Sequence, residues 1–263
     1  MFRDNSALNL PRDRYAENQH IAVSRWFASA CGAALLAEEE RVISARLSDR
    51  FGYHLLQVGA LPGADFLADS RILHRVVIRL HGEGPQPRYP WLRAEATRLP
   101  VESDSVDVMV LPHVLEFEPQ APQALREAAR VLVPEGHLVV SGFNPWSLFG
   151  LWRMARRHSG NAPWSGQFLA QSRLRDWFEL VGLEMTQSDL FFFRPPLRSR
   201  QGLQRLEAMD SVGRSLWPAL CGAFVLTARK RVTGSTALRP RFAMRRKVGG
   251  VSLASPPARM RDE

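Results

Sequence analysis

The chain has 263 residues, of which 45% are apolar, a formal net charge of +9 and two cysteines. This length allows one sizeable core with appendages or at most two small domains. Two cysteines cannot build a disulfide framework, and no apolar run approaches the roughly eighteen residues of a membrane-spanning helix. The polar N-terminus lacks the apolar stretch of a secretory signal, so we expect a cytoplasmic protein with reduced thiols.

The positive charge is concentrated at the C-terminus. From residue 229 to the end, ten Lys or Arg residues are opposed only by Asp262 and Glu263, so the segment 229–263 carries nearly all of the net charge. Such a segment is either a solvated extension or a contact for nucleic acid or an anionic surface. Its partner is not evident from the residues, and neither is the oligomeric state.

The pattern of apolar residues divides the chain into three parts. We expect a loosely ordered segment over 1–23, a folded domain over 24–232 and a basic, disordered tail over 233–263. Apolar residues at helical spacing open the folded domain. They predict one or two helices that are broken near Gly32 and end at Gly52.

Seven short apolar runs then predict strands, because near-continuous apolar strands suit a sheet covered on both faces. The runs are His54–Gly59, Ile72–Leu80, Trp91–Ala96, Val106–Pro112, His137–Phe143, Glu184–Arg194 and Gly222–Lys230.

Helices are predicted between these strands. One helix starts after the turn at Gly63, a second lies within 122–136 and stops at the Pro-Glu-Gly sequence, and another spans 202–216. A further helix over 172–184 has Ser172 as its N-cap and Gly182 as its terminator. Strands that alternate with helices predict an α/β fold with a doubly wound, mostly parallel sheet. Such a sheet binds its ligand beyond the carboxyl ends of its strands.

The most specific pattern lies between Glu95 and Ser147. Its features are Glu95-Ala96, Leu99-Pro100, Ser105-Val106-Asp107, His113-Val114-Leu115-Glu116 and the Arg130–Gly136 run Arg-Val-Leu-Val-Pro-Glu-Gly. In these features the chain resembles class I S-adenosylmethionine-dependent methyltransferases of the small-molecule kind often called type 11. It is also similar to a bacterial subgroup with a degenerate glycine-rich first motif and the sequence Ser-Gly-Phe-Asn-Pro after strand five.

The resemblance implies a seven-stranded Rossmann-like sheet with an antiparallel last strand, S-adenosylmethionine as cofactor and a small-molecule methyl acceptor. It implies that a glycine turn holds the methionine part of the cofactor, that an acidic residue after strand three orients adenine, and that the end of strand four walls the site. The cofactor residues implied are Gly59, Ala60, Leu61, Gly63, Glu95, Ala96, Leu111 and Pro112. The loops after strands four and five face the expected crevice, so His113, Asn144 and Trp146 are candidate substrate-pocket residues. His113 and Glu116 could serve as acid or base, and His113 is the candidate catalytic residue.

Three departures from the family pattern lie near the glycine turn. Leu61 stands where the second glycine is expected, and Gln57 replaces the usual acidic residue before the turn. The second strand ends in Arg79-Leu80-His81 without a carboxylate, the nearest being Glu83, and the connection to Glu95 is short for a helix.

These departures keep a second function open. The methyltransferase fold could be retained without catalysis, in a binding or regulatory protein whose basic tail contacts nucleic acid or a partner. A dinucleotide-dependent oxidoreductase is a third hypothesis, but it also needs an acidic residue after the second strand. The histidines show no paired spacing, so no metal site is expected.

The region after strand five has two further interpretations. Asn144-Pro145 could cap a helix, with Asn as N-cap and Pro at the first helical position, or it could line the substrate pocket. The aromatic residues of this region could form core or a lid over an apolar substrate. They are Phe143, Trp146, Phe149, Trp152, Trp164 and Phe168.

Overall fold

A computed structural model describes residues 21–80, 88–156, 163–197 and 199–231. The basic tail and most of the N-terminal segment 1–23 lie outside the described residues. Residues 21–23 are described, and they belong to a helix over 21–27. No helix in the described ranges has the length and hydropathy needed to cross a membrane.

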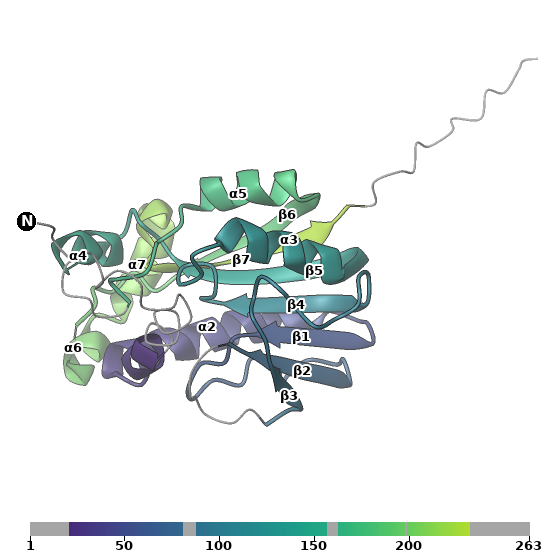
Figure 1. Ribbon diagram of the computed structural model, residues 1–263. Coiled ribbons are helices and arrows are strands. Elements are labelled where there is room, and N and C mark those ends of the chain that lie inside the picture. The colour runs from purple at the N-terminus through teal and green to yellow at the C-terminus, as the bar shows by residue number, and fades with distance from the viewer. Residues whose placement is uncertain (1–20, 81–87, 157–162, 198, 232–263) are drawn as a thin grey trace, which may run out of the picture. The chain divides into compact units, whose positions relative to one another are not determined.

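One seven-stranded sheet organises the molecule, with the strand order β3-β2-β1-β4-β5-β7-β6 (Figure 1). The pairs from β3 to β5 are parallel, whereas β7 runs antiparallel to both β5 and β6. This confirms the predicted doubly wound, mostly parallel sheet with an antiparallel last strand. The strands are β1 (His54–Val58), β2 (His74–Arg79), β3 (Trp91–Arg93), β4 (Val106–Pro112), β5 (Leu132–Phe143), β6 (Leu183–Phe191) and β7 (Ala223–Lys230).

Helices cover both faces of the sheet. α3 (Ala121–Val131) and α5 (Gln171–Leu180) lie on one face, and α2 (Ala30–Ser48) lies on the other (Figure 1). Alternate residues along the central strands enter two separate apolar clusters, one beneath α2 and one beneath α3 and α5. Burial on both faces explains why the sequences of these strands are almost continuously apolar.

Three further helices and a short 3-10 turn lie at the carboxyl end of β4, to the left in Figure 1. They are α4 (Leu148–Arg156), α6 (Arg200–Arg205), α7 (Ala208–Leu216) and η3 (Pro218–Leu220).

The N-terminal helices break earlier than the sequence predicts. The break falls at Ser29, whose hydroxyl accepts a hydrogen bond from the Gly32 N–H at 3.2 Å and caps α2. Gly32 lies inside α2, where an added Cβ would stand 2.3 Å from the Trp26 carbonyl oxygen. The glycine therefore permits close packing of two helices and does not end one. α2 ends at Ser48 and not at Gly52.

Three other local predictions are corrected. No helix follows Gly63, because residues 59–73 form turns and extended chain. α3 ends at Val131 and β5 begins at once, so the Pro-Glu-Gly sequence lies in a strand whose register against β4 shifts there. α5 begins at Gln171 after Ala170 and not after a Ser172 cap, although Gly182 does follow its end with a φ of 77°.

Candidate cofactor site

The turn after β1 has the backbone of a ligand-binding loop. Gly59 and Gly63 have φ values of 86° and 82°, which side chains disfavour. The Gly59 N–H donates to the Ile78 carbonyl at 2.8 Å, which ties the turn to β2. The Gln57 amide donates to the Gly59 carbonyl at 2.8 Å. Gln57 stands where the family pattern has an acidic residue, and its hydrogen bond stabilises the turn.

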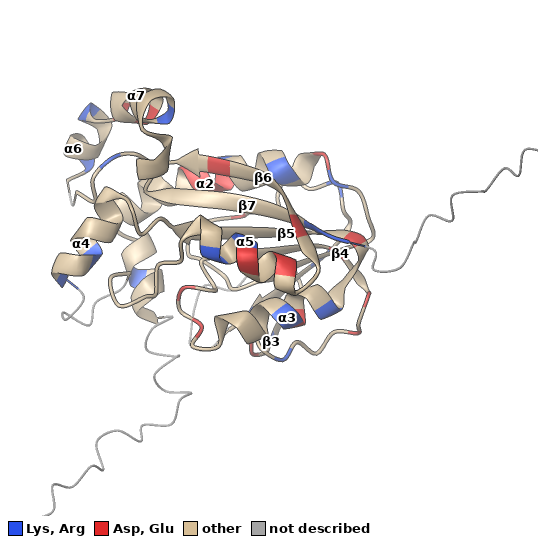
Figure 2. Cartoon of the chain, turned by 90° about the horizontal axis from the view of Figure 1, so that it is seen from above, with Lys and Arg blue, Asp and Glu red and all other residues tan. Residues whose placement is uncertain are grey.

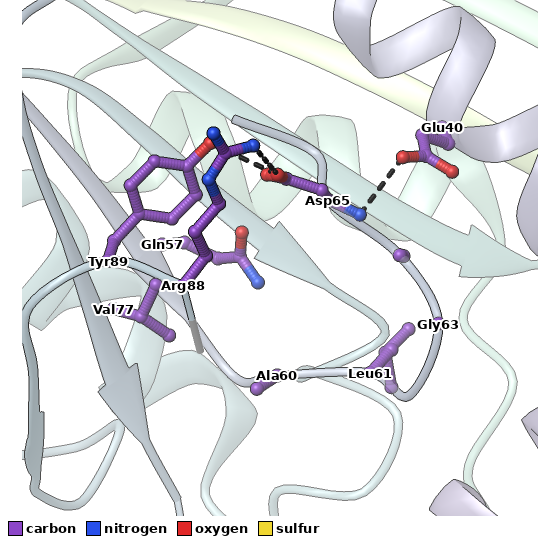
Figure 3. Close-up of a pocket in the computed structure, with 10 residues that line it drawn as sticks. Glu40, Gln57, Ala60, Leu61, Gly63, Asp65, Val77, Arg88 and Tyr89 are labelled. Atoms are coloured by element: carbon purple, nitrogen blue, oxygen red, sulfur yellow. Dashed lines mark hydrogen bonds and ion pairs between the residues drawn. The ribbon is translucent and has the colours of Figure 1, made fainter. Parts of the chain in front are cut away.

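A cavity of about 310 Å³ lies beside this turn (Figure 3). Its residues come from four parts of the chain: α2, the end of β1 with its turn, β2 and the segment before β3. They are Glu40, Gln57, Ala60, Leu61, Gly63, Ala64, Asp65, Val77, Arg88 and Tyr89. An added Cβ on Gly63 would meet nothing within 4 Å, so the open backbone of this glycine borders free space.

Polar side chains gather at one wall of the cavity (Figure 3). The Tyr89 hydroxyl donates to Asp65 Oδ2 at 3.2 Å, and Arg88 approaches the same oxygen at 3.8 Å. The Asp65 N–H donates to Glu40 Oε1 at 2.9 Å. Asp65 Oδ1 is buried and has no hydrogen-bond partner, which is costly unless a ligand supplies a donor.

Sequence reasoning missed Glu40, Asp65 and Tyr89. The predicted site ends at Gly63, two residues before Asp65, and the expected helix would have carried Asp65 away from the turn. No sequence signal marked the absence of a helix, because Ala64, Leu67 and Ala68 follow helical spacing. Glu40 lies in the helix before β1, and nothing in the sequence links it to the turn.

Leu61 stands at the position where the family pattern has its second glycine. Its side chain is 8% exposed, belongs to the apolar cluster beneath α2 and also lines the cavity. The substitution therefore adds an apolar wall to the cavity.

The remaining predicted cofactor residues are not among those that line the cavity. Pro112 lies close to the turn, because its carbonyl oxygen would stand 3.8 Å from a Cβ on Gly59. Leu111 and Ala96 are buried in the cluster beneath α3 and α5. Glu95 is exposed, and its carbonyl accepts the Arg98 N–H at 3.1 Å.

The end of β2 offers no carboxylate in the described residues. The Arg79 guanidinium lies over the Trp91 ring at 4.7 Å, and Leu80 is buried. Glu83 falls outside the described residues. Asp65 and Glu40 thus supply the carboxylates that border the turn.

His113 lies in a buried cluster with two carboxylates. Its Nδ1 is 2.6 Å from Glu116 Oε2, and its Nε2 is 3.2 Å from Glu39 Oε2. The Phe143 N–H donates to the other Glu116 oxygen. The His113 side chain is fully buried, with the Phe27 and Phe143 rings at 5.1 and 4.3 Å. No described group of residues, this cluster included, has the arrangement of a metal site.

The charge state of this cluster follows from two opposing effects. Burial lowers the pKa of His113, but Glu39 and Glu116 outweigh it and raise the pKa to about 10. Burial also raises the pKa of Glu116, against the hydrogen bonds from His113 and Phe143. We therefore describe His113 as an imidazolium that joins α2 to the end of β4.

Asn144 and Trp146 have different surroundings. Asn144 is buried, donates to the Ala219 carbonyl at 2.7 Å and accepts the Trp146 N–H at 3.1 Å. It does not cap α4, because Ser147 accepts the Gly150 N–H at 3.2 Å and fills that position. Trp146 is 76% exposed.

The aromatic region divides into core and surface. Phe143 and Phe149 stack at 5.7 Å, and Trp164 and Phe168 are also buried. Trp146 and Trp152 are exposed at the carboxyl end of the sheet.

The cavity wall carries the kinds of group that can hold the polar part of an adenosylmethionine molecule. This wall offers two carboxylates, a phenol hydroxyl and an arginine, and carboxylate oxygens accept hydroxyl or ammonium protons. The open backbone at Gly63 allows the close approach that such a cofactor needs.

Comparison with known proteins agrees with the fold. A family model described as a methyltransferase domain matches residues 70–140. A SAM-dependent methyltransferase of Thermotoga maritima superposes with a TM-score of 0.56 at 17% identity, covering 83% of this chain and 99% of that one, which shows the shared fold. The chain belongs to the class I S-adenosylmethionine-dependent methyltransferase family.

Two sequence relatives are more specific. The chain is 31% identical over 192 residues to the uncharacterized protein YafS of Escherichia coli, an alignment that covers 73% of this chain and 74% of YafS. It is 28% identical over 102 residues to a 2-phytyl-1,4-naphtoquinone methyltransferase of Trichormus variabilis, covering 39% of this chain and 42% of that protein.

Proposed function

We propose that the protein transfers the methyl group of S-adenosylmethionine to a small-molecule acceptor. The observation that carries this proposal is the cavity at the Gly59–Gly63 turn, with the unpartnered oxygen of Asp65 in its wall. The cofactor supplies an electrophilic methyl group when it is bound. The protein's task is then to hold donor and acceptor in line, which needs no dedicated base.

The cavity residues have distinct roles in this proposal. The Gly63 backbone and the carboxylates of Asp65 and Glu40 hold the polar parts of the cofactor, and Tyr89 fixes the position of the Asp65 carboxylate through its hydrogen bond. Leu61 excludes water from one side. Glu95 and the end of β4, at Leu111 and Pro112, remain proposed contacts for the adenine side.

The acceptor site is proposed at the carboxyl ends of β4 and β5, where Asn144 and Trp146 lie. His113 positions this edge through its links to α2 and β5. Its imidazole has no exposed surface in the structure, so a catalytic role would require the edge to open. The phytyl-naphthoquinone named for the Trichormus variabilis relative supports an acceptor with apolar character.

A transfer assay tests this proposal. S-adenosylmethionine with a tritiated methyl group is incubated with the protein and a cell extract. The reaction mixture is then separated into a solvent-extractable and an aqueous fraction. We expect label in the extractable fraction with wild type, and much less with Asp65→Asn. Label at the level of an enzyme-free blank in every fraction would refute methyl transfer.

The regulatory alternative rests on the basic tail, which lies outside the described residues. It predicts salt-dependent nucleic-acid binding by the full chain. The same preparation therefore separates the two functions: label transfer supports the enzyme, and nucleic-acid binding without transfer supports the alternative.

A further inference from the structure

Two segments at the carboxyl end of the sheet expose most of the molecule's large apolar side chains. Together they hold ten of the fifteen such side chains that are exposed among the described residues, so the apolar exposure is concentrated. We call these ten residues the apolar end surface. They are Trp146, Leu148, Leu151, Trp152 and Met154 around α4, and Met209, Val212, Leu216, Trp217 and Leu220 in α7 and η3.

The exposed face of α4 is fixed by its buried face. Leu148, Leu151 and Trp152 follow the i, i+3, i+4 spacing of one helix side. Phe149 and Gly150 are buried on the other side, where a Cβ on Gly150 would stand 1.8 Å from the Pro145 carbonyl oxygen. This close contact between Gly150 and Pro145 prevents α4 from rotating its apolar side towards the core.

The contacts of the inner side of α7 likewise fix which of its residues face outward. Met209, Val212 and Leu216 share its outer side, and the inner side carries the buried Asp210. Asp210 Oδ1 accepts the Phe193 N–H at 2.6 Å, and Oδ2 pairs with Arg194 Nε at 2.8 Å. A solvent-facing apolar stripe is thus built into both helices.

The charges around the apolar end surface are mainly positive. α4 contains Arg153 and Arg156 and no acidic residue (Figure 2). Over α4, α6 and α7, four arginines are exposed against the single exposed carboxylate of Glu207. These arginines are Arg156, Arg200, Arg205 and Arg214.

This combination matches the chemistry of an anionic lipid surface. Helices with Trp, Leu and Met on one side and Arg beside them lie in the membrane interface, where the apolar side enters the acyl boundary and the cations meet lipid phosphates. Three tryptophans, Trp146, Trp152 and Trp217, suit the headgroup level. Because no described helix can span a bilayer, the contact would be peripheral.

We propose that the apolar end surface docks the protein on an anionic lipid bilayer. The surface shares the carboxyl end of the sheet with the proposed acceptor site (Figure 1). Docking would therefore present that site to the membrane, where an acceptor with an apolar tail resides. Lipid binding itself requires no cofactor, so it can succeed or fail independently of methyl transfer.

Vesicle flotation of the full-length protein without cofactor tests this inference. Vesicles of pure phosphatidylcholine are compared with vesicles that contain one part phosphatidylglycerol to three parts phosphatidylcholine. Wild type is expected to float with the anionic vesicles, and Leu151→Glu with Trp152→Glu should reduce the bound fraction about tenfold or more. Leu216→Glu with Trp217→Glu should have the same effect from the second segment.

The matched control is Leu180→Glu on α5. Leu180 is 82% exposed but lies outside the apolar end surface, so its substitution should leave flotation unchanged. All five substituted positions are exposed, and unchanged melting curves would confirm folding. Failure of wild type to float with anionic vesicles would overturn the inference. Flotation of both the α4 variant and the α7 variant equal to wild type would also overturn it, because neither segment of the apolar end surface would then contribute.

Light scattering in solution gives a further decisive outcome. The inference predicts that the glutamate variants and wild type have the same mass. A wild-type dimer that the α4 substitutions dissociate would assign the apolar end surface to a second copy of the chain and contradict lipid docking.

Discussion

At the scale of single residues, the turn after β1 combines two left-handed glycines with side chains that depart from the family pattern. Gly59 and Gly63 retain the left-handed conformations of the turn, while Leu61 and Gln57 fill the positions that departed from the family pattern. The end of β2 carries no carboxylate in the described residues, whereas Asp65, two residues after the turn, lines the cavity beside it.

The first residue-scale prediction concerns Asp65. Asp65→Asn should weaken S-adenosylmethionine binding about tenfold or more, since it removes a charged acceptor from the cavity wall. Titration calorimetry measures the change. Asp69→Asn is the control, because Asp69 is exposed in the same loop and does not line the cavity. An equal loss of affinity in both variants would mean that Asp65 contributes only negative charge to the loop and makes no direct contact with the cofactor.

The second residue-scale prediction concerns pH. The folded-state pKa of His113 is raised to about 10 from an ordinary value of 6.5. A raised pKa gives stability that is fully present below the ordinary value and is lost as pH rises through about 10. The unfolding free energy of wild type should therefore fall more steeply between pH 7 and about 10 than that of His113→Gln.

Urea titrations of both proteins across this range provide the measurement. Their difference isolates His113 from other groups that titrate at high pH. Parallel curves would show that His113 is neutral in the folded protein.

At the scale of elements, Gly32 controls how the helix over 21–27 meets α2. The two helices approach so closely that a Cβ on Gly32 would be 2.3 Å from the Trp26 carbonyl oxygen and 2.5 Å from Phe27 Cα. This contact holds Phe27 over His113 and closes the buried cluster.

Gly32→Ala should therefore destabilise the fold by about 2 kcal/mol, an overpacking cost that backbone atoms cannot easily relieve. Ala33→Ser is the control, since Ala33 is the next residue and is exposed. Urea unfolding of the two variants tests the prediction. A Gly32→Ala protein as stable as wild type would show that the helices can separate without cost.

Element types were more predictable than element ends. Near-continuous apolar runs gave the seven strands, because both faces of the sheet are covered. The ends depended on single hydrogen bonds: Ser29 and Ser147 act as caps where Gly32 and Asn144 were expected to mark the boundaries. The site was only half predictable, because Asp65 and Tyr89 meet across 24 positions and Glu39 and His113 across 74.

At the scale of the whole molecule, the described residues, which end at Arg231, belong to one compact unit. The last strand is tied into it up to Arg231, which pairs with Glu184 at 2.9 Å. A chain ending at Thr233 should melt within about 2 °C of the full-length protein and bind cofactor equally well. Differential scanning calorimetry and cofactor titration check this. A large loss of either property would show that the basic tail completes the fold or the site.

The family assignment and the cavity both support one proposal, that the glycine turn binds S-adenosylmethionine. Titration calorimetry of the purified full-length protein with this cofactor, and with NAD⁺ as a non-ligand that also contains adenosine, tests this proposal most directly. We predict saturable one-to-one binding of S-adenosylmethionine, weakened by Asp65→Asn, and no binding of NAD⁺. No heat with S-adenosylmethionine up to millimolar concentration would contradict the account.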